Sequence, residues 1–405
     1  MRLFPTSILL NLLLVPSFAD VVVVDVSGAG DFIDLTSAVT AANPGDVLLM
    51  KSGTYPTADP LVLPNMSLAI VADTGADVTV GELASTGLSA GSRLVLSGLN
   101  VVADDDGQFD ALRLTNGAGS IRVQNCALSA SGGLGLRAWF CDDLILSRST
   151  MTGGTPAWPD PDGYGNDGSE GLGLRGGRTA AYDCGFTGGD GEDAYAGGLF
   201  CLAIGGRGGF GVLERDGARF YAMGCEFEGG DGGLGFCGGS DGPGGTGLLL
   251  SSISSAPSEA YVANAVFLPG ASPGGALAPP YVGPLIFLNE TRRELQAPAV
   301  VREGQAFSRT VVGRPGDRVY LPQSLTTTWR WLPPLGVLSL SGTITVGPML
   351  GVIGGGSHLV IPGQAPQLSS GEEVRWTHEQ VFVFKATNNR LLGATQVQFV
   401  LDSSF

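Results

Sequence analysis

Short runs of alternating apolar and polar residues, separated by Gly, Asn, Asp and Ser, dominate the chain from residue 57 to residue 270. In four of them a strand leads to Cys or Ser, an apolar residue follows two positions later, and a Gly-Gly pair ends the unit. Internal repeats of short strands are typical of a solenoid. The pattern predicts a parallel β-helix, and a twisted β-sandwich is the alternative that explains the repeats less well. The four units cover residues 121–133, 144–154, 179–191 and 219–233, with a degenerate copy at 261–270.

A second repeated strand precedes each unit and measures the coils. Arg113, Arg137 and Arg175 occupy similar positions in it, and successive intervals along the chain are 24 residues and then 36 to 38. Three coils therefore contain extra loops. Because neighbouring strands lie about 4.8 Å apart, we expect these loops to stack in one tier. They fall near residues 151–168, 187–208 and 228–245.

The segment before the repeats predicts a strand, a turn, a short helix at residues 35–42 and a second strand. Pro44 and Gly45 end the helix, since proline cannot continue it. This segment, VDVSGAGDFIDLTSAVTAANPGDVLLMKSGTY, resembles the N-terminal part of pectin-lyase-like right-handed β-helix proteins. The resemblance implies a right-handed parallel β-helix over residues 20–285, capped by the short helix. It implies little about activity, because lyases, hydrolases, esterases, epimerases and adhesins share the fold.

After residue 290 glycine becomes rarer, and alternating strands are joined by Pro and Gly turns. This pattern predicts a separate small β-sandwich over residues 290–405, so the whole chain should be all-β. With its PGD turn and its terminal strand TQVQFVLD, the region resembles C-terminal modules of secreted planctomycete-type bacterial proteins. That resemblance implies a surface or export role and no reaction.

The N-terminus has the parts of a signal peptide. Arg2 precedes an apolar run from Leu3 to Val15, and Ala19 stands before the expected cleavage point. Residues 1–19 are therefore predicted to direct secretion or display at the cell surface. The run is short for a membrane span, which needs about 20 residues, although an uncleaved anchor is the alternative. We expect no transmembrane segment after cleavage.

The composition of the chain excludes some classes of partner and of structure. The net charge of −16 argues against nucleic acid, which needs a basic face. Glycine supplies 65 of the 405 residues, yet 43% are hydrophobic, so the chain is not a disordered glycine polymer. Regular glycines between apolar runs predict many tight turns.

Six cysteines lie between Cys126 and Cys237, which in an exported chain predicts disulfides. Coils with a loop cysteine also have a cysteine at the strand position, and the coil with a serine there has none. A redox or metal site is the alternative, but no Cys-x-x-Cys pair supports it. Because strand and loop cysteines are present or absent together, we predict the disulfides Cys184–Cys201 and Cys225–Cys237. The remaining two cysteines would then form Cys126–Cys141.

The long loops are acidic, and residues 188–196 match a calcium-binding nonapeptide once. Stacked carboxylates repel unless a cation lies between them, and calcium takes six to eight oxygen ligands. Asp-Gly is also ordinary turn chemistry, which is the alternative. The candidate calcium ligands are Asp190, Asp193, Asp231 and Asp241.

Arg113, Arg137 and Arg175 should point outward, one above another, because the leucines beside them point inward. Such a column needs anions close by. These are either neighbouring Asp and Glu or an acidic polysaccharide, whose carboxylates match guanidinium forks. The resemblance to pectate lyases implies that one of the three could act as a catalytic base beside calcium.

Three aromatic residues are candidates for stacking on sugar rings: Trp139, Trp158 and Tyr164. Packing in the core or the loops is their alternative role. The predicted β-helix contains no histidine, which excludes a Ser-His-Asp triad within it. The favoured hypothesis is therefore a non-catalytic surface protein that binds polysaccharide or packs in an extracellular layer. The alternative is a polysaccharide lyase that uses an arginine and calcium on acidic glycans.

Overall fold

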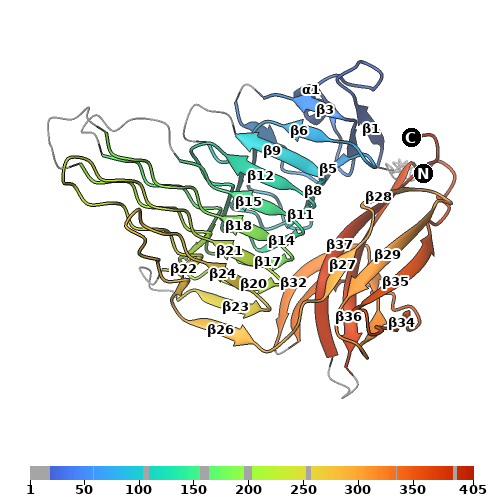
Figure 1. The fold of residues 1–405 in the computed structure, drawn as a ribbon. Coiled ribbons are helices and arrows are strands. Elements are labelled where there is room, and N and C mark those ends of the chain that lie inside the picture. The colour runs from blue at the N-terminus through green and yellow to red at the C-terminus, as the bar shows by residue number, and fades with distance from the viewer. Residues whose placement is uncertain are drawn as a thin grey trace, which may run out of the picture.

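The computed structural model describes residues 19–57, 59–103, 109–155, 164–195, 203–251, 257–333, 335–385 and 390–405. Within these ranges the chain has one helix and is otherwise built from β-strands and their connections (Figure 1). Nearly all of the predicted signal peptide, together with Trp158 and Cys201, lies outside the described residues. No helix in the described ranges is long and apolar enough to cross a membrane.

Three parallel sheets, A, B and C, form the first part of the chain. Each coil passes from sheet A to sheet B and then to sheet C before the chain returns to sheet A one strand further along. This rotation confirms the predicted parallel β-helix. Sheet A contains, in spatial order, β1 (Val21–Val24), β2 (Val47–Met50), β5 (Leu68–Ala72), β8 (Arg93–Ser97), β11 (Ser120–Gln124), β14 (Asp143–Ser147), β17 (Arg178–Tyr182), β20 (Arg219–Met223), β23 (Glu259–Ala263) and β26 (Leu285–Leu288).

Sheets B and C have eight strands each and follow the same order along the helix axis. Sheet B contains β3 (Gly53–Tyr55), β6 (Val78–Val80), β9 (Leu99–Ala103), β12 (Ala127–Ala130), β15 (Thr150–Thr152), β18 (Gly185–Thr187), β21 (Glu226–Glu228) and β24 (Val266–Leu268). Sheet C contains β4 (Leu61–Leu63), β7 (Leu83–Thr86), β10 (Leu112–Thr115), β13 (Leu136–Trp139), β16 (Leu172–Arg175), β19 (Val212–Arg215), β22 (Leu248–Leu250) and β25 (Tyr281–Val282).

The short helix α1 (Leu35–Ala41) closes the N-terminal end of the core, as predicted. The side chain of Asp34 caps it by accepting a hydrogen bond from the backbone N–H of Ser37 at 2.7 Å. Leu35, Ala38 and Val39 are buried against the first coil. The apolar interior of the β-helix is therefore covered at this end.

A single left-handed residue makes each of the later turns from sheet A to sheet B. Asn125, Asp183 and Asn264 have φ of 52°, 55° and 47°, a conformation that Asn and Asp tolerate better than most residues. The residue after each turn points into the core, and Cys126, Cys184 and Cys225 are buried there. The repeated cysteine therefore occupies a position of the coil whose side chain points into the core.

The C-terminal region is all-β, as predicted, and consists of three further sheets. The largest contains β28 (Val300–Arg302), β37 (Arg390–Leu401), β36 (Val374–Phe384), β30 (Arg318–Tyr320) and β34 (Gly351–Val352), with β31 (Gln323–Ser324) pairing β36. The others contain β27 (Glu294–Gln296), β29 (Ala306–Val312) and β35 (His358–Gln364), and the pair β32 (Thr326–Leu332) with β33 (Gly336–Ser341).

This C-terminal domain packs along the outer face of sheet A (Figure 1), so that most strands of sheet A are covered on both faces. Val47 and Val71 of the β-helix share an apolar cluster with Trp376 and Phe399. The buried side chain of Gln124 both donates to the carbonyl of Val397 and accepts from its N–H, each at 2.8 Å. The C-terminal domain therefore packs directly against the β-helix.

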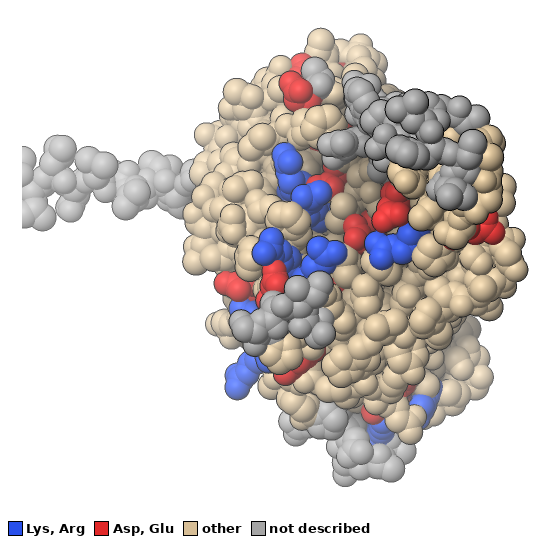
Figure 2. Space-filling model, turned by 90° about the vertical axis from the view of Figure 1, so that its left-hand side faces the viewer, with Lys and Arg blue, Asp and Glu red and all other residues tan. Residues whose placement is uncertain are grey.

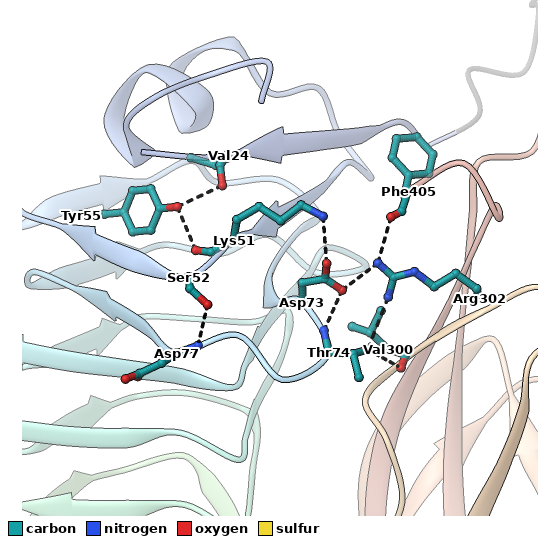
Figure 3. A network of polar contacts seen from close by, with 10 residues as sticks. All are labelled: Val24, Lys51, Ser52, Tyr55, Asp73, Thr74, Asp77, Val300, Arg302 and Phe405. Atoms are coloured by element: carbon teal, nitrogen blue, oxygen red, sulfur yellow. Dashed lines mark hydrogen bonds and ion pairs between the residues drawn. The ribbon is translucent and has the colours of Figure 1, made fainter. Parts of the chain in front are cut away.

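Ion pairs join the two parts near the N-terminal coils (Figure 3). Asp73 pairs with Lys51 of the same coil and with Arg302 of the C-terminal domain, both at 2.8 Å. Arg302 also donates to the carbonyl of Phe405 at 3.0 Å. The C-terminal domain thus covers most of the outer face of sheet A, and sheets B and C retain outward faces.

The three long loops stack in one tier, and their glycines serve packing more than turning. We call their described parts, residues 164–171, 188–195, 203–211 and 229–247, the glycine bundle. The N–H groups of Gly188, Gly191 and Ala194 donate to carbonyls of the following coil, at residues 228, 231 and 234. Those of Gly189 and Glu192 donate to an antiparallel neighbour, at residues 169 and 166. In residues 188–194, every third N–H therefore points to the same neighbour, and three residues per turn is the periodicity of a polyproline II helix.

Adjacent segments of the bundle approach too closely for side chains. A Cβ at Gly206 would lie 1.8 Å from the carbonyl oxygen of Asn166, and one at Gly230 would lie 2.0 Å from that of Gly189. Neither glycine has a positive φ, so neither is needed for a left-handed turn. The expectation that glycines mark tight turns is therefore wrong for these two, where the absent side chain lets the backbones approach each other.

Gly206→Ala tests this packing. The added methyl group forces the neighbouring backbone to shift, and we expect it to lower the free energy of unfolding by about 1–3 kcal/mol, measured by chemical denaturation. Gly347→Ala is the matched control, because nothing lies within 4 Å of a Cβ there. Equal denaturation midpoints for Gly206→Ala and the wild type would contradict the bundle.

Candidate functional site

The arginines singled out from the sequence lie on the outer face of sheet C, in two columns. Arg113 pairs in register with Arg137. Arg175, however, pairs with Trp139 on one side and with Arg215 on the other. The prediction that Arg113, Arg137 and Arg175 form one column is therefore wrong for Arg175, which lies two residues further along its strand.

The error has a physical cause. LGLRA at residues 134–138 and LGLRG at 172–176 look equivalent, but the structure pairs Leu136 with Leu172. Side chains on a strand alternate between faces, so a shift of two residues keeps each arginine on the outer face while moving it sideways. Arg215, which the sequence reasoning missed, joins the site through this register.

Arg137, Arg175 and Arg215 line an open groove of about 420 Å³ over β13, β16 and β19, and Arg113 lies on the neighbouring strand β10 outside it. The groove also contains acidic groups, Glu170 at its edge and Asp216 at the turn after β19. Figure 2 shows basic and acidic side chains gathered together on this side of the molecule. The surface is thus one of mixed charge with a basic centre.

Trp139 lies at the middle of the groove, in contact with two arginines. The guanidinium carbons of Arg137 and Arg175 are 4.6 Å and 5.6 Å from its ring centroid. Arg137 is also held by Asp110, whose carboxylate lies 2.6 Å from its Nε and is itself buried. Arg175 pairs with Asp216. These contacts fix the orientation of Trp139 and both guanidinium groups.

The two flanking arginines differ from the central pair. Arg113 on β10 and Arg215 on β19 are exposed. Among the described residues, neither side chain has an ion pair or hydrogen bond. Neighbouring carboxylates therefore pair with Arg137 and Arg175.

The other two aromatic candidates do not join this groove. Tyr164 is partly exposed at the start of one segment of the glycine bundle and does not line the groove. Trp158 lies outside the described residues. Of the three aromatic predictions, Trp139 is the one that the structure places beside the arginines.

The predicted disulfide pairs are wrong where the structure tests them. Cys126, Cys141, Cys184 and Cys225 are buried free thiols. Cys126 follows the turn from sheet A to sheet B, whereas Cys141 follows β13 of sheet C, where the chain returns to sheet A. The free thiols contradict the pairs Cys126–Cys141 and Cys225–Cys237. The predicted pair Cys184–Cys201 includes a residue outside the described ranges.

The strand cysteines have interior partners instead. The thiols of Cys126 and Cys184 each donate to the carbonyl two residues earlier, at 3.3 Å. Burial raises the pKa of both Cys126 and Cys141 to about 11. These groups therefore stay protonated at neutral pH and act as small core residues.

The four predicted calcium ligands act as hydrogen-bond acceptors within the glycine bundle. Asp190 accepts from the N–H of Asp231, and Asp193 from that of Leu234, both at 2.7 Å. Asp231 accepts from residue 271 at 2.7 Å, and Asp241 from residue 235 at 3.0 Å. Among the described residues, no three His, Cys, Asp or Glu side chains are grouped to hold a metal ion. The structure thus gives these carboxylates a backbone role.

Glu214 lies beneath the groove, on β19 between two groove-lining residues, and its side chain points into the core. Burial raises the pKa of its carboxyl well above the ordinary value, and the charge of Glu259 acts in the same direction. The sequence could have predicted this buried acid, because Glu214 lies two residues after Val212 on the same strand and so points to the same interior face.

Substitutions of Asp190 separate the two roles of the carboxylates. If Asp190 serves as a hydrogen-bond acceptor, Asp190→Asn keeps an acceptor oxygen and leaves the melting temperature unchanged, whereas Asp190→Ala lowers it. A chelator should have no effect on either variant or on the wild type. Equal destabilisation by chelator, Asn and Ala would instead support calcium.

The buried Glu214 predicts a pH-dependent stability. The pKa of Glu214 is higher in the folded chain than in the unfolded chain. Its contribution to the stability of the fold is therefore fully present below about pH 4.5, the ordinary pKa of a glutamate, and is lost as the pH rises. Each further pH unit costs up to about 1.4 kcal/mol until the folded pKa is reached. Glu214→Gln should therefore match the wild type near pH 4 and exceed its stability at pH 8.

Thermal unfolding across this pH range checks the prediction. Glu226→Gln, at an exposed position of β21, is the control and should leave the difference between pH 4 and pH 8 as in the wild type. A Glu214→Gln curve that runs parallel to the wild-type curve would contradict the buried, protonated carboxyl.

Comparison with known proteins identifies no family. No protein-family model matches the chain, and no curated protein is similar to it in sequence. Among solved structures, a mutant of the PL6 family alginate lyase AlyGC aligns at a TM-score of 0.26 with 12% identity, over 61% of this chain and 39% of the lyase. ORF18 of Geobacillus virus E2 aligns at a TM-score of 0.20 with 10% identity, over 89% of this chain and 82% of that one. At these scores neither likeness bears on the activity of this chain.

Proposed function

We propose that this chain is an exported or cell-surface β-helix protein that binds an acidic polysaccharide in the groove over sheet C without cleaving it. The observation that carries the proposal is Trp139, held between Arg137 and Arg175 in an open groove. An indole offers a flat apolar face to a sugar ring. Guanidinium groups on either side supply directed donors to carboxylates.

The flanking arginines extend this surface across the strands. Arg113 and Arg215 belong to β10 and β19, which are separated in sheet C by β13 and β16. Three strand spacings correspond to about 14 Å, enough for several sugar units of a chain that runs along the helix axis. Both flanking side chains are exposed, so a polyanion can contact them at little cost in desolvation.

Binding is favoured over cleavage by the state of the central arginines. A lyase base must accept a proton from the substrate, and arginine remains protonated in proteins at ordinary pH. Arg137 also forms an ion pair with Asp110, whose carboxylate lies 2.6 Å from its Nε. The lyase alternative would need a group that removes a proton from one of these guanidinium ions.

Titration with acidic and neutral glycans tests the proposal. We expect polygalacturonate or alginate to bind, neutral β-glucan not to bind, and added salt to weaken the affinity. Trp139→Ala and Arg215→Ala should each weaken binding about tenfold, the equivalent of about 1.4 kcal/mol. Arg330→Ala, at an exposed position of β32, is the control and should bind as the wild type does.

The same samples decide between binding and cleavage. Failure of every acidic glycan to bind, or equal affinities for Trp139→Ala and Arg330→Ala, would contradict the proposed site. A steady rise in the absorbance of unsaturated uronides, abolished in Arg137→Ala, would make the protein a lyase instead.

A further inference from the structure

The C-terminal end of the β-helix is an open apolar surface. The strands β24, β25 and β26 are the edges of sheets B, C and A, and in the described chain no further coil covers them (Figure 1). The most exposed large side chains here are Leu277 at 69%, Phe287 at 57% and Val266 at 52%. We call this end the tail face. Its other exposed hydrophobic residues are Leu268, Tyr281, Val282 and Ile286.

The last coil, which forms the tail face, is uncharged, whereas the coil before it places Glu226 and Glu228 beside Val266 and Leu268. Residues 260–289 contain no Asp, Glu, Lys, Arg or His, although 15% of the whole chain is charged. Contiguous exposed apolar surface of this kind is uncommon on monomeric proteins and is typical of interaction sites.

The aromatic rings of the tail face are already ordered. Phe267, Tyr281 and Phe287 contact one another with centroid distances of 5.4, 5.5 and 6.3 Å. Phe267 also stacks on Phe227 of the preceding coil at 5.0 Å. The end therefore presents a fixed apolar surface, and little side-chain entropy is lost when it is covered.

The two ends of the β-helix are not equivalent, and this limits how copies can associate. The N-terminal end is covered by α1, whose Leu35, Ala38 and Val39 are buried against the first coil. A head-to-tail stack would require α1 to leave that position. Two tail faces, in contrast, can meet directly around a two-fold axis, and such an isologous contact closes on itself.

The edge strands also oppose open-ended growth. Pro269 follows β24, Pro280 precedes β25, and Pro284 precedes β26. Proline beside a short edge strand limits the addition of further strands. The contact is therefore made by side chains over a finite area.

We propose that the tail face is a dimer interface, at which two copies of this chain associate tail to tail. The net charge of −16 makes copies repel one another elsewhere, and the uncharged end is where they can approach at least electrostatic cost. The dimer carries one glycan groove on each copy, and its existence does not depend on the proposed glycan binding.

Sedimentation velocity of the full mature chain tests the interface. The wild type should sediment with twice the mass of one chain at high concentration, and added salt should preserve or strengthen the dimer because it screens the net charge. Leu277→Lys should weaken dimerisation about tenfold or more, since it places a charge in the contact. Its thermal unfolding should match that of the wild type, because Leu277 is 69% exposed.

Val62→Lys is the matched control, since Val62 is an apolar residue of β4 with 66% exposure near the capped end. It should dimerise as the wild type does. A wild type that is monomeric at every concentration would overturn the proposal and leave the face to another partner. Equal weakening by Val62→Lys and Leu277→Lys, or dissociation by salt, would also overturn it.

Discussion

The structure depends on one constraint: every coil of the β-helix must present its backbone donors and acceptors in register with the coil before it. In the three sheets this is met by parallel ladders such as Ile121 with Leu144 and Leu144 with Thr179. In the glycine bundle the same requirement is met without strands, by donors that recur every third residue. Long insertions are tolerated because they too satisfy the backbone of the neighbouring coil.

That constraint also places the functional surface. Side chains on the outer face of a ladder recur at strand spacing, so residues far apart in the chain, such as Trp139 and Arg215, become neighbours across two strands. The C-terminal domain covers most of the outer face of sheet A, and some of the contacts are between polar groups. Arg122 and Asp143 form a buried ion pair at 2.9 Å beside it. His378 is buried there and has a pKa well below its ordinary value, because of burial and the charges of Arg122 and Arg93.

Much of the fold was predictable because its rules are local. Repeated strands, the capping helix and the change of character after residue 290 follow from periodicity and turn residues. The burial of sheet A was also indicated, since strands such as VLLM at 47–50 and LAIVA at 68–72 are apolar throughout, a pattern of sheets covered on both faces. That the cover is the C-terminal domain itself depends on docking between distant segments, which local patterns do not encode.

The candidate site was predictable only in part. Alternation along the strand predicts that Arg137 and Arg175 point outward. It does not predict whether they pair in register, because side chains two residues apart on a strand point to the same face. The cysteine pairs failed because joint occurrence reports a repeated interior position as readily as a covalent bond. The contacts of the aspartates were not predictable, because backbone N–H groups compete with a metal ion for carboxylate oxygens, and that competition depends on the packing of the bundle.

The most direct test of the proposed site is the crystal structure of the mature chain with an acidic oligosaccharide such as a galacturonate oligomer. The account predicts a sugar ring stacked on Trp139, with carboxylates of the same oligomer on Arg113 or Arg215 and the axis of the oligomer across the strands of sheet C. An oligosaccharide bound over sheet B or the glycine bundle, with Trp139 uncovered, would contradict it.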